Sequence, residues 1–282
     1  MKNLSKAIWA LALSAMMVPV SAAAECADQP GACKIEAGSY ELQLPMQSDS
    51  PAPVVIFLHG YGGNGKSALI SEHIAGPILR RGYAVIAPNA LRRDGSGPRA
   101  WNFHPDFRTG RDEYEFIRAV LADAAANHNL DTSRVLLSGF SIGGSMTAYI
   151  ACETPGFFHA YAPVGGNVWR PHPLSCAAPV KMFHTHGWTD STVPLEGRVV
   201  GSGFTQGDVF HALGIWRQSN RCDQPRANVF SQTGMFMRRA WTNCAPGSAL
   251  EFALFPGGHT VPEGWADMAL DWFEKHVPPV TN

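Results

Sequence analysis

Short apolar runs alternate with longer amphipathic segments along most of this chain. Gly, Pro or Asn bound the apolar runs, which is typical of buried strands that end in turns. The predicted strands are residues 40–44, 54–59, 84–87, 135–138, 159–164, 182–186 and 252–255. The predicted helices are residues 66–81, 112–128, 142–152, 210–220 and 264–276. This alternation indicates an α/β fold, with a mostly parallel central sheet and helices on both of its faces.

Three long segments interrupt the alternation. Residues 89–110 are rich in Gly, Pro and Arg, and residues 165–179 and 194–207 are similar excursions. Ligands of open parallel sheets bind at the carboxyl ends of the strands, where long loops carry many of the contacts. We therefore expect these segments to lie above a substrate site.

The amino terminus has the pattern of a secretory signal peptide over residues 1–24. Lys2 and Lys6 form its charged region, residues 7–18 its apolar region, and Ala22-Ala23-Ala24 an A-x-A cleavage site. The apolar region is too short to span a bilayer, so no stable membrane insertion is expected. We predict an exported protein, periplasmic or extracellular, in which residues 25–282 form a single catalytic domain.

Charge and cysteine content narrow the function further. A formal net charge of −1 gives no reason to expect a nucleic-acid partner. All six cysteines follow the signal peptide, and an even number in an exported chain predicts three disulfides, with buried free thiols as the alternative. No C-x-x-C motif is present, so no metal site is expected. The pairing that keeps each loop short joins Cys26 with Cys33, Cys152 with Cys176, and Cys222 with Cys244.

The predicted strand at 135–138 leads into Gly139-Phe140-Ser141-Ile142-Gly143, a G-x-S-x-G motif that continues into a predicted helix. A serine on such a turn is raised clear of the sheet, and the glycines allow the backbone to pass close to it. Ser141 is therefore the candidate nucleophile. A chain with 28 glycines can contain this motif by chance, so the assignment depends on its surroundings.

A nucleophilic serine needs a general base, and the base needs an acid that holds its orientation. Asp190 follows the predicted strand at 182–186, and His259 follows the one at 252–255. Singly, such residues are usually turn formers or solvated side chains. Together, in the order Ser, Asp, His and just past strand ends, they predict a catalytic triad. Other candidates are less well placed, namely Ser145 within the helix, Glu196 and Asp208 further into loops, and His184 and His186 before the acid.

An oxyanion needs N–H donors, which we expect from the backbone of Ile142 and of Tyr61 in the loop at 59–63. An ordinary turn is the alternative for that loop. Residues 60–67 also satisfy the G-x-x-x-x-G-K-[ST] pattern of a phosphate-binding loop. An exported protein meets little ATP, and no predicted strand ends directly in the aspartate such enzymes use near Mg²⁺, so nucleotide binding is disfavoured.

With these residues in place, the chain resembles the secreted esterases grouped with polyhydroxybutyrate depolymerases and feruloyl esterases, within the α/β-hydrolase superfamily. The resemblance rests on His59-Gly60, Trp101-Asn102-Phe103, Asp131-Thr132-Ser133-Arg134-Val135 with the serine motif, His186-Gly187 with Asp190 and Val193-Pro194, Gly257-Gly258-His259-Thr260, and the cysteines at 222 and 244. It implies an α/β-hydrolase fold with Ser141 as nucleophile, Asp190 as orienting acid and His259 as general base. Trp188 stands where the family often has a small residue.

The resemblance and the triad together predict a secreted serine esterase that acts through an acyl-enzyme without a metal or organic cofactor. Trp101 and Trp188 are expected to line the acyl pocket, with Tyr61, Phe103 and Trp169 on bordering loops, unless these rings pack the loops onto the core. Soluble or oligomeric esters, of polyhydroxybutyrate, feruloyl or acetyl type, are favoured over crystalline polymer. The alternatives are a serine peptidase of the prolyl-oligopeptidase type and a non-catalytic exported binding protein on the same fold.

Overall fold

The computed structural model describes residues 25–26, 29–46, 50–107, 110–201 and 203–279. The predicted signal peptide, residues 1–24, lies outside the described residues. None of the helices in the described part is both long and apolar enough to cross a bilayer.

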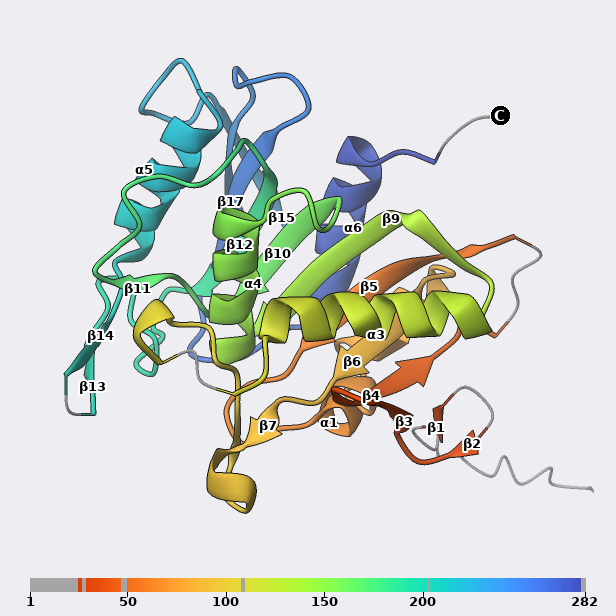
Figure 1. Ribbon diagram of the computed structural model, residues 1–282. Coiled ribbons are helices and arrows are strands. Elements are labelled where there is room, and N and C mark those ends of the chain that lie inside the picture. Colours follow the sequence, from red (N-terminus) through yellow and green to blue (C-terminus); the bar gives the residue numbers. More distant parts are fainter. Residues whose placement is uncertain (1–24, 27–28, 47–49, 108–109, 202, 280–282) are drawn as a thin grey trace, which may run out of the picture.

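A 12-stranded sheet forms the centre of the molecule (Figure 1). Its middle strands are all parallel, and neighbours pair in the order β6, β5, β9, β10, β12, β17. Their bounds are Ala84–Pro88, Ala52–Leu58, Leu130–Phe140, Ala160–Val164, Lys181–Gly187 and Ala249–Phe255. At one edge β4 (Gly38–Gln43) is antiparallel to β6, and beyond it come β3 (Cys33–Ile35), β1 (Glu25–Cys26) and β2 (Gln29–Pro30). The predicted mostly parallel sheet is confirmed.

Helices cover both faces of this sheet, each through its own hydrophobic cluster. On one face lie α3 (Glu113–Asn127), α4 (Ile142–Glu153) and α5 (Val209–Ser219). On the other lie α1 (Gly65–Leu69), α2 (Ala75–Arg80) and α6 (Trp265–His276). Aspartates cap the amino ends of two long helices. The side chains of Asp112 and Asp208 accept backbone N–H groups in the first turns of α3 and α5.

One predicted helix is wrong in its extent. The segment 66–81 forms two short helices, α1 and α2, joined by a turn. Pro77 lacks the N–H that a continuous helix would need, and its ring would collide with the carbonyl group four residues earlier. The same proline is tolerated in the first turn of α2, so the chain breaks just before it.

The sequence pattern also missed several short strands. An antiparallel hairpin, β15 (Val229–Thr233) and β16 (Phe236–Trp241), extends the sheet beyond β17. Most of β15 is exposed on both sides, so it shows no alternation of apolar and polar residues. The predicted long loops contain further short elements. A small sheet consists of β11 (Trp169–Arg170), β13 (Val199–Val200) and β14 (Phe204–Gln206), and a hairpin consists of β7 (Leu91–Arg92) and β8 (Arg99–Ala100). Two single-turn helices are η1 (Arg93–Gly95) and η2 (Pro105–Phe107).

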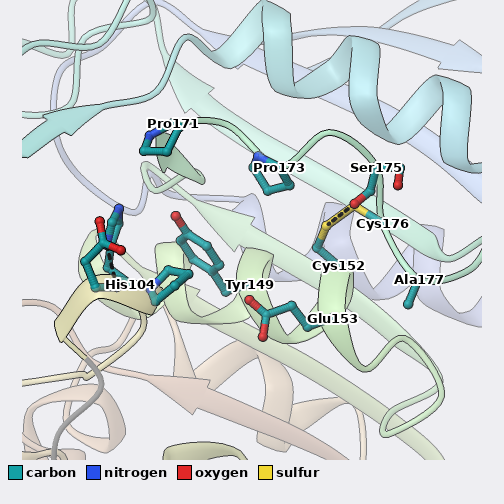
Figure 2. Close-up of a pocket in the computed structure, with 11 residues that line it drawn as sticks. His104, Tyr149, Cys152, Glu153, Pro171, Pro173, Ser175, Cys176 and Ala177 are labelled. Carbon is teal, nitrogen blue, oxygen red and sulfur yellow. Dashed lines mark hydrogen bonds and ion pairs between the residues drawn. A yellow bond between two sulfur atoms is a disulfide. The ribbon is translucent and has the colours of Figure 1, made fainter.

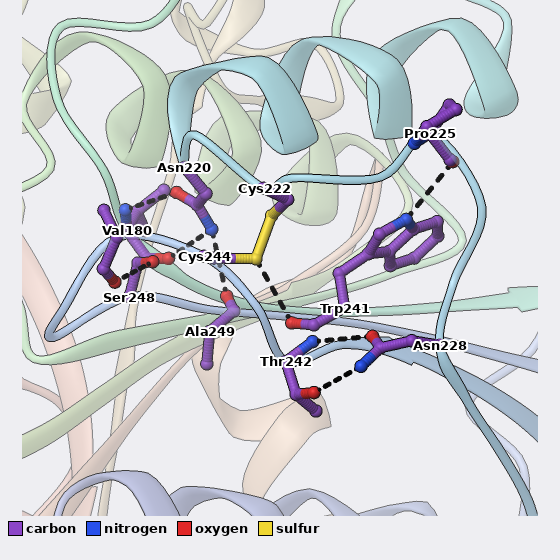
Figure 3. The surroundings of a disulfide bond; sticks show 11 residues. Val180, Asn220, Cys222, Pro225, Asn228, Trp241, Thr242, Cys244, Ser248 and Ala249 are labelled. Carbon is purple, nitrogen blue, oxygen red and sulfur yellow. Dashed lines mark hydrogen bonds between the residues drawn. A yellow bond between two sulfur atoms is a disulfide. The ribbon is translucent and has the colours of Figure 1, made fainter.

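The three disulfides in the structure are the short-loop pairs, Cys26–Cys33, Cys152–Cys176 and Cys222–Cys244. Figure 3 shows the last of these beside the end of α5. Next to it the buried Asn220 accepts the Val180 N–H at 2.8 Å and donates to the carbonyl oxygens of Val180 and Ala249 at 2.9 and 3.3 Å. This side chain ties α5 to the starts of β12 and β17, the two strands that Asp190 and His259 follow.

Candidate active site

Ser141 occupies a sharp turn between β9 and α4, with φ 59° and ψ −122°. A residue with a side chain in this region of backbone space costs about 1–3 kcal/mol, which the surrounding contacts must offset. The Ser141 N–H donates to the Val164 carbonyl group at 2.9 Å, which fixes the turn against β10. A Cβ atom on Gly139 would lie only 2.5 Å from the Gly143 carbonyl oxygen, so the motif glycine is required by close backbone packing.

The three predicted triad residues meet above the ends of β9, β12 and β17. His259 Nε2 lies 2.8 Å from Ser141 Oγ, and His259 Nδ1 lies 2.7 Å from Asp190 Oδ2. The second carboxylate oxygen of Asp190 accepts the backbone N–H groups of Thr192 and Val193 at 2.9 and 2.8 Å. Every oxygen of this buried carboxylate therefore has a partner that orients it toward the histidine.

The protonation state of the acid follows from these contacts. Burial alone raises the pKa of Asp190, but the hydrogen bonds from His259 and from the Val193 N–H lower it more, so the net pKa lies below its usual value. An ionised Asp190 accepts a hydrogen bond from the Nδ1–H group of His259, so the unprotonated Nε2 directs its lone pair at the Ser141 hydroxyl. This is the tautomer that a general base needs.

Two further histidines support the turn that carries the acid. His186 Nε2 lies 2.7 Å from the Val193 carbonyl oxygen, and His186 Nδ1 lies 3.1 Å from His184 Nε2. Burial lowers the pKa of both rings, so both are neutral, and His186 donates to Val193 while it accepts from His184. The sequence analysis placed both histidines at the strand end. It did not predict this chain of hydrogen bonds, because the acceptor is the Val193 carbonyl group on the following loop.

The loop at 59–63 is held beside the nucleophile. Trp101 Nε1 donates to the His59 carbonyl group at 2.9 Å, and the Gly62 N–H donates to the Arg99 carbonyl group at 2.9 Å. A Cβ atom on Gly60 would lie 3.4 Å from that of Ser141. Burial lowers the pKa of His59 to about 4, against an opposing hydrogen bond with Gly60, so its ring is neutral and keeps the loop's contacts at neutral pH.

The two predicted oxyanion donors flank Ser141. Tyr61 and Ile142 both line the same cavity as Ser141. The first hydrogen bond inside α4 runs from the Ser145 N–H to the Ser141 carbonyl oxygen, so the Ile142 N–H precedes the intrahelical ladder. Such an N–H at the start of a helix is suited to bind a negative charge.

The apparent phosphate-binding motif serves as a helix start. Asn64 caps α1 by accepting the Ser67 N–H at 2.9 Å, and the Asn64 N–H donates to Ser67 Oγ at 3.2 Å. The lysine of the motif, Lys66, is exposed on this five-residue helix. The asparagine and the serine of the motif are therefore accounted for by local capping.

A cavity of about 910 Å³ opens at Ser141. Its wall is aromatic and comes from the predicted long loops, through Trp101, Phe103, Trp169 and Phe204. Trp101 lies in this lining, but its side chain is buried and donates to the His59 carbonyl group, so it also packs its loop onto the core. Trp188 is absent from the lining: its N–H donates to the Phe255 carbonyl group, and the residue is 60% exposed.

A second cavity, of about 490 Å³, lies between α4 and the loop that carries Pro171 and Pro173 (Figure 2). The ring of Tyr149 contacts that of Phe103 at a centroid distance of 5.7 Å, so an aromatic layer separates the two cavities. No triad residue lines the second cavity. Within the described residues, no group of three or more His, Cys, Asp or Glu side chains is placed to hold a metal ion.

Comparisons with known proteins show the family and the fold of the chain. The family model described as Phospholipase/Carboxylesterase matches residues 43–206, which include Ser141 and Asp190. Poly(3-hydroxyalkanoate) depolymerase C of Paucimonas lemoignei is 30% identical over 135 residues, which are 45% of this chain and 31% of that protein. Feruloyl esterase C of Emericella nidulans is 25% identical over 250 residues, 83% of this chain and 82% of its own length.

Other relatives are longer than this chain. The chain spans 22% of the bifunctional acetylxylan esterase/xylanase of Neocallimastix patriciarum and 43% of feruloyl esterase B of Piromyces equi. Among solved structures, an acetyl xylan esterase from Aspergillus awamori aligns with a TM-score of 0.61 at 17% identity, and covers 83% of this chain and 93% of that one. At this identity the likeness shows the fold. The chain belongs to the phospholipase/carboxylesterase family and has the α/β-hydrolase fold.

Proposed function

We propose that this protein is an exported serine esterase that hydrolyses carboxylic esters. The observation that carries the proposal is the hydrogen-bonded chain from Ser141 through His259 to Asp190, at the mouth of an aromatic cavity. Relatives named as feruloyl esterase, acetylxylan esterase and polyhydroxyalkanoate depolymerase support the same reaction.

The reaction proceeds through two steps. Ser141 Oγ attacks the ester carbonyl carbon while His259 Nε2 takes its proton, and the imidazolium is stabilised by Asp190. The N–H groups of Ile142 and Tyr61 bind the oxyanion, and one such donor is worth about 3–4 kcal/mol in the transition state. His259 then protonates the leaving alcohol, and a water molecule activated by the same histidine releases the acid from the acyl-enzyme.

The cavity suits small or oligomeric esters with an apolar part. Its volume of about 910 Å³ is that of a site for a drug-sized ligand, and its aromatic wall offers flat apolar surface. Feruloyl, acetyl and hydroxyalkanoate esters are the proposed substrate classes. Residues 1–24 are proposed to direct export, and the three disulfides support export to an oxidising compartment. Residues 25–282 are proposed to form one catalytic domain.

The test compares Ser141→Ala with the unaltered protein on a feruloyl ester, an acetylated sugar, a hydroxybutyrate oligomer and a para-nitrophenyl ester. Loss of the nucleophile is expected to remove about 10⁴-fold or more of the turnover, in protein that melts at the usual temperature. Ser231→Ala, at an exposed site on β15, is the matched control. Full activity of Ser141→Ala, cleavage of peptides in preference to esters, or no turnover by the unaltered protein would each refute the proposal.

A further inference from the structure

Three arginines, Arg92, Arg93 and Arg198, line the mouth of the active-site cavity. Asp94 is the one acidic residue among the lining residues, so the mouth has an excess of positive charge although the whole chain has a net charge of −1. All three arginines are exposed and come from two separate loops. The excess is therefore a local property of this opening.

These arginines keep free hydrogen-bonding capacity. Arg92 Nη1 and Arg198 Nε donate to the carbonyl groups of Gly97 and Thr192 at 3.3 and 2.8 Å. The guanidinium group of Arg93 lies 5.9 Å from the centroid of the Tyr61 ring. Within the described part of the chain, none of the three forms an ion pair with a carboxylate. Each can therefore still bind an anion.

Arg93 and Arg198 reach the cavity of the nucleophile from two different loops. Arg93 is placed over Tyr61 on the loop that faces Ser141, whereas Arg198 is bonded to Thr192, whose N–H binds Asp190. The same cavity is also lined by aromatic side chains that are buried, namely Trp101, Phe103 and Trp169. The cavity thus has an aromatic wall and a cationic mouth.

We propose that this active site selects esters that carry a carboxylate, bound at the mouth by Arg93 and Arg198 with the apolar part of the substrate against the aromatic wall. This inference rests on the proposed esterase function. Guanidinium groups match carboxylates in both charge and geometry, and exposed positive charge at a cleft raises the local concentration of anionic substrate. A neutral acetyl ester gains nothing from these groups.

The test uses two matched pairs of esters. In one pair, para-nitrophenyl hydrogen adipate against para-nitrophenyl methyl adipate, the charge lies on the acyl side. In the other, para-acetoxybenzoate against para-acetoxybenzamide, it lies on the alcohol side. The quantity compared is the ratio of kcat/KM for the anionic ester to that for the neutral ester, so a general loss of activity cancels.

The double variant Arg93→Gln/Arg198→Gln is expected to lower this ratio about tenfold in at least one pair, mainly through KM, since two charge-assisted contacts are lost. Arg198→Lys retains the charge and most of the ratio. Arg226→Gln, exposed and absent from the cavity lining, is the matched control and leaves the ratio unchanged. Raising NaCl to about 0.5 M lowers the ratio of the unaltered protein, because exposed charges are screened.

A ratio that is the same in the double variant for both pairs overturns the selection of carboxylates while ester hydrolysis stands. The same holds if Arg226→Gln lowers the ratio as much as the double variant does. Failure of the unaltered protein to hydrolyse any of these four esters overturns the selection, and it refutes the proposed function as well only if the esters of the first panel are not hydrolysed either. The pair in which the ratio falls identifies the side of the ester that carries the carboxylate.

Discussion

Replacing Asp190 by Asn should abolish most activity through the wrong histidine tautomer. Asp190 Oδ1 accepts two backbone N–H groups, from Thr192 and Val193, at 2.9 and 2.8 Å. An asparagine must keep its oxygen there, which turns its NH₂ group toward His259 Nδ1, 2.7 Å away in the native site. His259 Nδ1 then has to accept a hydrogen bond, so its proton moves to Nε2, which faces Ser141 Oγ and no longer takes the serine proton.

A base held in the wrong tautomer loses about 10⁴-fold in kcat, which corresponds to about 5.5 kcal/mol of transition-state stabilisation. The assay is steady-state hydrolysis of para-nitrophenyl butyrate at neutral pH, with the melting temperature measured alongside. Asp208→Asn is the matched control, because Asp208 also accepts a backbone N–H, from His211 at 2.7 Å, but caps α5. Its kcat should stay within about twofold of the unaltered value.

Two results would refute this reasoning. A folded Asp190→Asn protein that retains more than about a tenth of the native kcat would show that Asp190 does not set the histidine tautomer. An equal loss in Asp208→Asn would show that the effect comes from a weakened loop and not from the triad.

Three further predictions concern stability. The pKa of His59 is about 4 in the folded protein and 6.5 in the unfolded chain, so between these pH values the unfolded chain binds more protons than the folded protein. The free energy of unfolding should therefore fall by about 3 kcal/mol as the pH drops from 6.5 to 4. In His59→Asn, urea titrations across this pH range should show a free energy of unfolding that depends less on pH, and an unchanged dependence on pH would contradict the assignment. Cys152→Ser/Cys176→Ser should lower the free energy of unfolding by about 2–4 kcal/mol through the freed chain, and no change in the urea midpoint would argue against that disulfide. Asn220→Ala should cost about 2–4 kcal/mol, because the buried Val180 N–H loses its partner and the carbonyl groups of Val180 and Ala249 each lose a donor, and a loss below about 0.5 kcal/mol would contradict it.

The sequence predicted the sheet, and the meeting of Ser141, Asp190 and His259, because both follow from local patterns. The parallel strands are buried on both faces and therefore appear as continuous apolar runs. Ser141, Asp190 and His259 each follow a parallel strand, and parallel pairing alone brings the ends of β9, β12 and β17 to one edge of the sheet. Local patterns thus sufficed to place distant residues together.

Features that depend on loop packing were not predictable in this way. Trp188 follows a strand end like the triad residues, yet it is 60% exposed and does not line the cavity. The cationic mouth forms because Arg93 and Arg198, which are far apart in sequence, line the same cavity as Ser141. The support that His186 gives to the acid loop depends on a carbonyl group, at Val193, that no side-chain pattern reveals.

The central claim is that Ser141 is an activated nucleophile, and covalent labelling tests it most directly. The full protein is incubated with a fluorophosphonate probe, digested, and mapped by mass spectrometry. The account predicts one label per chain, on the peptide that contains Ser141, and a labelling rate that falls sharply in His259→Ala. A protein that stays unlabelled, or a label on any other serine, would contradict it.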